Sequence, residues 1–190
     1  MASYDLVVIG TGPGGYVCAI RAAQLGMKVA VVEKNATLGG TCLNVGCMPS
    51  KALLHASEMF EEAGHSFAKM GVSVPPPKLD LPAMMNFKQQ GIDGNVKGVE
   101  FLMKKNKVTV IWGDATIDAP GKITVKKSAV EAPKGASGEG SYQAKHIIVA
   151  TGARPRVLPG LEPDKKLIWT YFEAMVPERM PRSEEHTSEL

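Results

Sequence analysis

Two cysteines five positions apart, Cys42 and Cys47, are the residues of this sequence best suited to chemistry. They lie in the stretch GGTCLNVGCMPSK, among glycines and just before a proline and a lysine. Such a pair can belong to a zinc site, a structural disulfide or a redox couple. A structural zinc site commonly takes four ligands in two close pairs, and no histidine stands at a companion spacing. We therefore predict no metal site.

The spacing also makes a purely structural disulfide a poor explanation. On one continuous helix, Cα atoms of residues five apart are about 8–9 Å apart, beyond the roughly 7 Å that a disulfide spans. The chain must bend between them, and Asn44 and Gly46 permit the bend, while Pro49 favours the start of a helix. A loop this short yields little entropic stabilisation. Lys51, close to a thiolate at a helix start, favours redox chemistry instead.

A glycine-rich turn near the start of the chain predicts a dinucleotide site. The apolar run YDLVVIG is typical of a strand buried on both faces, and GGYVCAIRAAQLG has helical spacing. At their junction, Gly10, Gly12 and Gly15 form the pattern G-x-G-x-x-G. These glycines serve a tight turn, the approach of a pyrophosphate and close packing of helix on strand. The phosphates would lie at the start of the helix.

Two further segments are expected to reach the same ligand. Glu33 ends the next strand-like run, KVAVVEK, where a carboxylate can accept hydrogen bonds from ribose hydroxyls. The buried run IIVATGARP, residues 147–155, leads into Thr151 and Gly152, a turn whose backbone can lie against a cofactor. The glycine pattern alone does not distinguish FAD from NAD.

The order of the elements predicts an α/β fold with a parallel sheet. Strand, glycine-rich turn, helix and strand make a βαβ unit with a right-handed crossover. Helical spacing recurs over residues 50–70 and 81–105, on either side of the proline-rich loop VSVPPPKLD. Three strand-like runs follow, VTVIWGDATI, KITVKK and KHIIVATGARP, and predict a small antiparallel excursion that returns to the sheet. The loop 132–141 is predicted to be a hairpin connection.

Composition limits the class of protein. The chain has 190 residues, 44% hydrophobic and 22% charged, with a net charge of +3, as an ordinary globular protein has. Charges are spread without a block of one sign, so we expect no nucleic-acid partner. No apolar run reaches the length of a membrane span, so we expect no membrane association. With three cysteines and no leader expected before Tyr4, the sequence predicts a cytoplasmic protein.

The motifs GTGPGG, GGTCLNVGCMPSK and ATGARP, in this order, resemble those of the pyridine nucleotide–disulfide oxidoreductases. The resemblance covers residues 1 to about 181 and implies a Rossmann-like FAD-binding domain. Glutathione and mercuric reductases share the Cys-x₄-Cys pattern. The continuation PSKALL is more similar to the dihydrolipoamide dehydrogenases, the E3 components of 2-oxo acid dehydrogenase complexes. Met48 stands where those proteins often carry isoleucine, a change that conserves volume.

The resemblance implies an FAD site beside a redox-active cysteine pair. Cys42 would be the interchange thiol and Cys47 the charge-transfer thiolate nearer the flavin. Electrons would pass from dihydrolipoamide through the disulfide and FAD to NAD⁺. The cofactor-binding residues that it implies are Gly10, Gly12, Gly14, Gly15, Glu33, Lys34, Gly39, Gly40, Thr41, Lys51, Ala115, Ala150, Thr151 and Gly152. Cys18, inside the first helix, is expected to be a small buried residue.

The resemblance also implies partners and further domains. Family members form homodimers, and the E3 proteins act on lipoyl domains of the 2-oxo acid dehydrogenase complexes. They also carry an NAD-binding domain and a dimerisation domain with a His–Glu acid–base pair, and we expect these 190 residues to end before both domains. We expect residues 1–155 to be the first part of the FAD-binding domain and 156–181 to start the connection to the NAD-binding domain. Residues 182–190, RSEEHTSEL, resemble a translated sequencing adapter and are expected to be an artefact.

The expected function is oxidation of dihydrolipoamide by NAD⁺, with this chain inactive by itself. An exposed sheet edge, where a missing segment should pair, is the physical reason for that expectation. The alternatives are a flavoprotein like the glutathione or mercuric reductases and an inert flavin-binding fragment. A further alternative is a plain NAD-dependent Rossmann protein in which the cysteines are incidental.

Overall fold

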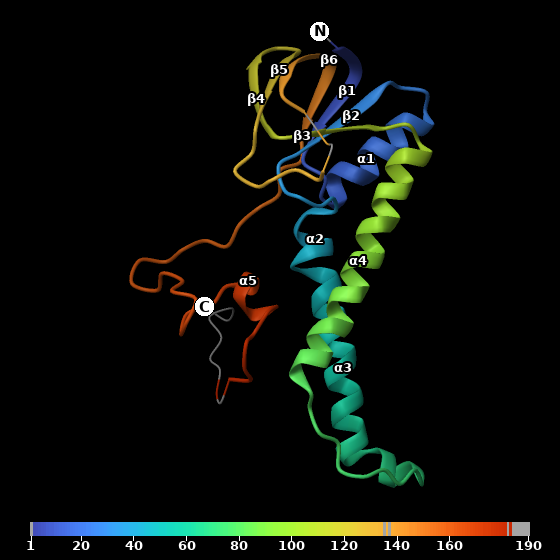
Figure 1. Ribbon diagram of the computed structural model, residues 1–190, viewed down its shortest axis with the longest axis vertical. Coiled ribbons are helices and arrows are strands. Elements are labelled where there is room, and N and C mark those ends of the chain that lie inside the picture. The colour runs from blue at the N-terminus through green and yellow to red at the C-terminus, as the bar shows by residue number, and fades with distance from the viewer. Residues whose placement is uncertain (1, 135, 137, 182, 184–190) are drawn as a thin grey trace.

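The structure is a computed structural model that describes residues 2–134, 136, 138–181 and 183. A six-stranded sheet forms one end of the molecule, and a long hairpin of two helices extends away from it (Figure 1). The expected artefact, residues 182–190, lies outside the described residues except for Ser183.

The sheet is parallel in one half and antiparallel in the other, in the order β3-β2-β1-β6-β5-β4. Its strands are β1 (Ala2–Ile9), β2 (Val29–Glu33), β3 (Thr109–Trp112), β4 (Asp114–Ala119), β5 (Lys122–Lys126) and β6 (Gly140–Val149). Strand β1 pairs in parallel with both β2 and β6, and β2 pairs in parallel with β3. Strand β5 pairs antiparallel with β4 and β6. The mixed α/β fold with an antiparallel excursion is therefore confirmed.

Alternating side chains of the central strands form two cores, one on each face of the sheet. Val8 and Val31 belong to the core that α1 (Pro13–Gln24) covers, together with Ala19 of that helix. Val7 and Val32 belong to the core on the other face. Because both faces are covered, β2 is buried along its whole length, as its continuous apolar sequence predicts.

The helical hairpin follows the cysteine region. It consists of α3 (Cys47–His65) and α4 (Leu81–Lys105), and the short η1 (Phe67–Met70) follows α3. Helix α4 has the predicted bounds. Its start is capped by the Asp80 side chain, which accepts a hydrogen bond from Ala83 N at 3.0 Å. Two short helices complete the set, α2 (Gly40–Asn44) and α5 (Tyr171–Ala174).

The run VTVIWGDATI was expected to be one strand, and the structure divides it at Gly113 into β3 and β4. A Cβ at Gly113 would overlap with the backbone of Lys126, so the chain approaches β5 more closely there than a side chain permits. Strand β3 consequently extends the parallel half, while β4 begins the antiparallel excursion. The predicted hairpin connection is confirmed, because Val125 of β5 pairs with Gly140 of β6.

Strand β6 has one edge paired with β1, and its other edge is only partly paired. Strand β5 pairs with β6 over Gly140 to Gln143, whereas β1 pairs with β6 as far as Val149. Beyond the β5 contact, Ile148 and Val149 are 38% and 61% exposed. Along this part of β6, no described strand pairs with the edge that faces away from β1.

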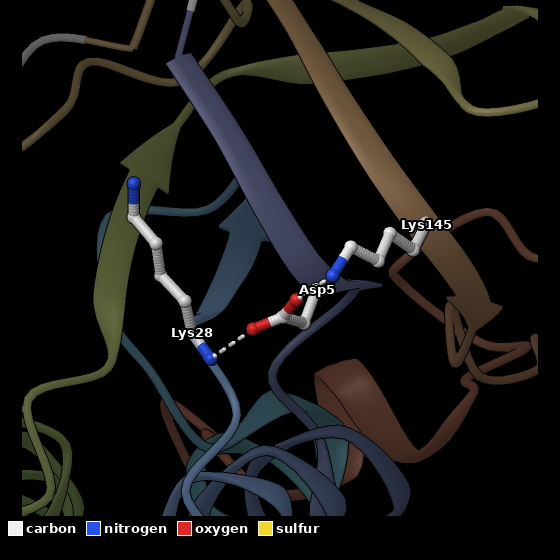
Figure 2. A network of polar contacts seen from close by, with 3 residues as sticks. All are labelled: Asp5, Lys28 and Lys145. Carbon is white, nitrogen blue, oxygen red and sulfur yellow. Dashed lines mark hydrogen bonds and ion pairs between the residues drawn. The ribbon is translucent and has the colours of Figure 1, made fainter.

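A polar contact joins the middle of β1 to the middle of β6 and to the residue before β2 (Figure 2). The Asp5 carboxylate of β1 lies 2.7 Å from Lys145 Nζ of β6 and accepts a hydrogen bond from Lys28 N at 2.8 Å. Both contacts lower the pKa of Asp5, the bond to Lys145 most strongly. The carboxylate thus links β1 to β6 and to the residue that precedes β2.

None of the helices within the described residues has both the length and the apolar character needed to cross a bilayer.

Candidate functional site

The turn between β1 and α1 lies against the end of β6. Ala150 N donates a hydrogen bond to Ile9 O at 2.8 Å. Gly10 has φ of +101°, and a Cβ there would overlap with the carbonyl of Ala150. Only glycine meets both conditions, the left-handed backbone and the close approach. Two segments 140 residues apart in the chain numbering, the turn at Gly10 and the turn at Ala150, are therefore in direct contact.

The start of α1 leaves space for a ligand. A Cβ at Gly15 would overlap with Gly10 O, so the helix packs directly on the turn. By contrast, a Cβ at Gly14 would have no heavy atom within 4 Å, and one at Gly12 would have only Gly40 Cα, at 4.0 Å. Gly12 is the N-cap residue, and no side chain caps the helix. Open space beside an uncapped helix start fits an anionic group such as a pyrophosphate.

A third segment, at the start of α2, closes on the same turn. Gly39 N donates to Thr11 O at 3.0 Å. Gly40 has φ of +57°, and a Cβ there would lie 2.6 Å from Gly12 Cα. The structure thus brings together the three glycine-containing segments expected to bind the cofactor, residues 10–15, 39–41 and 150–152.

The Glu33 carboxylate at the end of β2 is buried, with 4% exposure, and accepts four hydrogen bonds from the chain itself. Its Oε2 accepts from Thr11 N at 3.2 Å and from the Thr11 hydroxyl. Its Oε1 accepts from Asn35 N at 2.8 Å and from Asn35 Nδ2 at 2.7 Å. The carboxylate therefore fixes the glycine-rich turn to the end of β2. Sequence reasoning did not single out Thr11 or Asn35.

A cavity of about 410 Å³ opens beside Glu33. Lys34 also lines it, together with Trp112, Gly113 and part of the connection between β5 and β6. Ala115, expected near an adenine, lies on β4 and is not among the lining residues. The sequence offered little indication that Trp112 and Gly113 line a cavity, since both were expected in the middle of one strand.

The two cysteines lie on different helices. Cys42 is in α2, and α3 begins at Cys47. Asn44 holds the segment that precedes them, because its Nδ2 donates to Leu38 O at 3.0 Å and to Gly40 O at 2.9 Å. The predicted bend between the cysteines is therefore confirmed.

Both thiols are free in the structure and lie near enough to influence each other. The hydrogen bond to Cys47 raises the pKa of the Cys42 thiol, and partial burial raises it further. The positive charge of Lys51, one turn into α3, opposes this effect weakly. Cys42 therefore keeps its proton to a higher pH than an isolated cysteine does.

Within the described part of the chain, no three histidine, cysteine or acidic side chains cluster closely enough to hold a metal ion. Cys18 is half-buried in α1 and packs against the core beneath that helix.

Comparison with known proteins places this arrangement in a family. Residues 4–183 match the family described as "Pyridine nucleotide-disulphide oxidoreductase". The chain is 52% identical to a dihydrolipoyl dehydrogenase of Rhizobium etli over 95% of its own length and 39% of the relative's. It is 48% identical to the mitochondrial dihydrolipoyl dehydrogenase of Pisum sativum, over 94% of the chain and 34% of the relative. It is 46% identical to a leghemoglobin reductase of Glycine max, over 94% of the chain and 33% of the relative.

The chain thus spans between a third and two fifths of the length of these relatives. The match covers the glycine-rich turn, both cysteines and the segment after β6. The chain belongs to the pyridine nucleotide–disulfide oxidoreductases, a family of FAD-dependent flavoproteins.

Proposed function

We propose that the chain is the N-terminal part of an enzyme of the dihydrolipoyl dehydrogenase type, which converts dihydrolipoamide and NAD⁺ to lipoamide and NADH. The observation that carries the proposal is the proximity of Cys42 and Cys47, which lie on two successive helices. Gly40, which begins the first of these helices, packs on the glycine-rich turn. These positions support a dithiol near a turn that would bind an anion.

FAD would be held by the residues around that turn. Gly12, Gly14 and the start of α1 would bind its pyrophosphate, and Glu33 with Lys34 would face the adenosine ribose. Lys51 would lie beside the isoalloxazine ring. The remaining contacts would come from Gly10, Gly15, Gly39, Gly40, Thr41, Ala115, Ala150, Thr151 and Gly152. When bound, FAD supplies the acceptor for the two electrons that the cysteine pair takes from dihydrolipoamide.

The cysteines would carry out thiol–disulfide exchange. In their oxidised form, a thiolate of dihydrolipoamide attacks Cys42 Sγ, the Cys42–Cys47 bond breaks, and Cys47 leaves as a thiolate. The second lipoyl thiolate then attacks the lipoyl sulfur of the mixed disulfide, which releases lipoamide and the Cys42 sulfur. Cys42 takes one of the two protons that dihydrolipoamide loses, in accord with its raised pKa. The other goes to a base, a role the family resemblance assigns to the His–Glu pair.

The proposal includes the expected domain boundaries and partners. Residues 1–155 form the first part of an FAD-binding domain, and 156–181 start the connection to an NAD-binding domain. In the whole protein we propose a homodimer that serves lipoyl domains of 2-oxo acid dehydrogenase complexes, in the cytoplasm. The 190-residue chain by itself is proposed to be inactive, and the exposed Ile148 and Val149 at the edge of β6 support this.

Reconstitution with FAD tests the proposal. The purified chain is mixed with FAD, desalted, and its visible spectrum is recorded before and after addition of dihydrolipoamide under nitrogen. We expect retained flavin and a dithiol-induced long-wavelength band that Cys47→Ser abolishes. Cys42→Ser, the matched control, should keep a thiolate at Cys47 and hence the band. A chain that retains nicotinamide but no flavin would contradict the proposal, and steady-state turnover would refute inactivity of the isolated chain.

A further inference from the structure

Helix α2 is too short to be stable by itself, and the side chain of its last residue, Asn44, ties its two ends together. The helix has five residues, Gly40–Asn44, and isolated helices of that length do not persist in water. Asn44 Nδ2 donates to Gly40 O at 2.9 Å and to Leu38 O at 3.0 Å. One amide group therefore binds the first residue of the helix and the chain just before it.

The oxygen of the same amide group is held as well. The Thr37 hydroxyl donates to Asn44 Oδ1 at 2.9 Å. A flipped amide group would turn Oδ1 toward the carbonyl oxygens of Leu38 and Gly40, which cannot donate. Only the observed orientation satisfies all three partners, so both polar atoms of Asn44 are fixed.

The points to which Asn44 is tied are themselves fixed in the fold. The Leu38 side chain is 1% exposed and belongs to the core that α1 covers. Gly40 packs on the glycine-rich turn, where a Cβ would lie 2.6 Å from Gly12 Cα. In Figure 1, α2 lies between the sheet and the start of the helical hairpin. Asn44 therefore links the core and the glycine-rich turn to the end of α2.

The bend that separates the two cysteines starts at Asn44. A Cβ at Gly46 would lie 3.2 Å from Thr41 O, so the chain turns closely against α2. Helix α3 then begins at Cys47. Cys42 lies within α2, between the two ends that the amide group joins. A rotation of the end of α2 would therefore change the position of Cys47 relative to Cys42.

We propose that Asn44 is a positioning residue for the cysteine pair, because it fixes the end of α2 so that the bend brings Cys47 near Cys42. This role rests on the proposed function, in which the two sulfurs form and break one disulfide bond. Sulfurs that are held near each other form that bond more readily. The pKa of Cys42 reports the same proximity, since Cys47 raises it first and partial burial second, while the charge of Lys51 opposes both.

Asn44→Ala in the full 190-residue chain tests the proposal, with Asn106→Ala as its matched control. Asn106 makes the same kind of bond at the end of α4, from Nδ2 to the carbonyl four residues earlier, Leu102 O, at 2.8 Å. Both variants lose such a bond, so both should lower the urea midpoint. Helix α4 carries no cysteine, so only Asn44→Ala should change the chemistry of the pair.

Modification by iodoacetamide gives the first readout. The rate at Cys42 in the reduced chain, without FAD, is measured against pH by peptide mass spectrometry. Asn44→Ala should raise the rate at pH 8 and shift the pH profile at least halfway toward that of Cys47→Ala, in which the neighbouring sulfur is gone. Asn106→Ala should retain the parent profile.

Equilibrium with glutathione gives the second readout. Two glutathione molecules reduce the Cys42–Cys47 bond to two thiols and leave as one glutathione disulfide. Asn44→Ala should shift this equilibrium toward the dithiol by about fivefold or more, the factor that corresponds to one hydrogen bond of ordinary net strength. Greater exposure of Cys42 alone would accelerate its modification but leave the glutathione equilibrium unchanged.

A glutathione equilibrium in Asn44→Ala equal to that of the parent would overturn the proposal, and so would equal shifts in Asn44→Ala and Asn106→Ala. If Asn44→Ala does not fold, Thr37→Val decides, since it removes only an exposed hydroxyl that orients the amide group. It should shift both readouts in the same direction by a smaller amount, and unchanged values would overturn the proposal. Neither readout needs FAD, so a chain that retains no flavin would contradict the proposed function and leave this test intact.

Discussion

Replacement of Glu33 by glutamine should destabilise the chain even without a cofactor. The side chain is 4% exposed and accepts two hydrogen bonds from Thr11 and two from Asn35. Glutamine keeps the size of the side chain but exchanges one acceptor oxygen for an amide group that donates. In either orientation, that amide group faces a backbone N–H, of Thr11 or of Asn35.

The magnitude follows from these contacts. One backbone donor loses its acceptor, which costs about 1–3 kcal/mol where it is buried. The remaining bonds change from charge-assisted to neutral, with a loss of roughly 1 kcal/mol each. The neutral amide is easier to bury than a carboxylate, which offsets part of this loss. We expect the free energy of unfolding to fall by about 3 kcal/mol.

Urea unfolding at pH 7, followed by far-ultraviolet circular dichroism without added FAD, measures this change. Glu58→Gln on the exposed face of α3 is the control and should stay within about 0.5 kcal/mol of the parent. Thr11→Val removes only the hydroxyl donor. The double variant Thr11→Val/Glu33→Gln should therefore lose less stability than the sum of the losses in the two single variants. A Glu33→Gln protein as stable as the control, or strict additivity with Thr11→Val, would refute the reasoning.

Three further predictions concern other contacts. Gly40→Ala places a Cβ 2.6 Å from Gly12 Cα. It should lower the free energy of unfolding by about 2 kcal/mol and weaken FAD retention. The control Gly14→Ala has open space around its Cβ and should leave the urea unfolding curve unchanged. Cys47→Ala removes the bond that raises the pKa of Cys42, so iodoacetamide should modify Cys42 faster at pH 8, as peptide mass spectrometry would show; an unchanged rate would exclude the bond. Asp5→Asn breaks an ion pair whose lysine is 75% exposed, and its urea midpoint should match that of an exposed control.

Local signals predicted the helices well. The helical spacing of apolar residues over 81–105 is a signal read from neighbouring residues, and α4 has these bounds. The division at Gly113 could not be predicted in this way. It results from the approach of Lys126, a residue of another strand, and no pattern within VTVIWGDATI records that approach.

In the candidate site, too, features within one segment were predictable and contacts between distant segments were not. The glycine pattern indicated which segments converge, because the close approaches at Gly10 and Gly40 tolerate no side chain. The partners of Glu33 were not predictable, because Thr11 is 22 residues away and any residue at that position supplies the backbone N–H. Sequence spacing likewise cannot show that the pKa of Cys42 is raised, since this depends on how close the bend brings the two sulfurs.

The occupied carboxylate of Glu33 leads to a last prediction about cofactor binding. Each carboxylate oxygen has about two lone pairs, and all of them are already used by Thr11 and Asn35. A ribose hydroxyl must therefore replace an existing donor. The Thr11 hydroxyl is fully buried, so the side-chain amide of Asn35, whose bond is only part-buried, is the donor that can leave.

Exchange of one hydrogen bond for another is nearly neutral, so Asn35→Ala should change FAD affinity by no more than about threefold. Fluorescence titration of FAD measures this. A loss of tenfold or more would mean that Asn35 holds the carboxylate in the bound state, and that the ribose reaches Glu33 without displacing it.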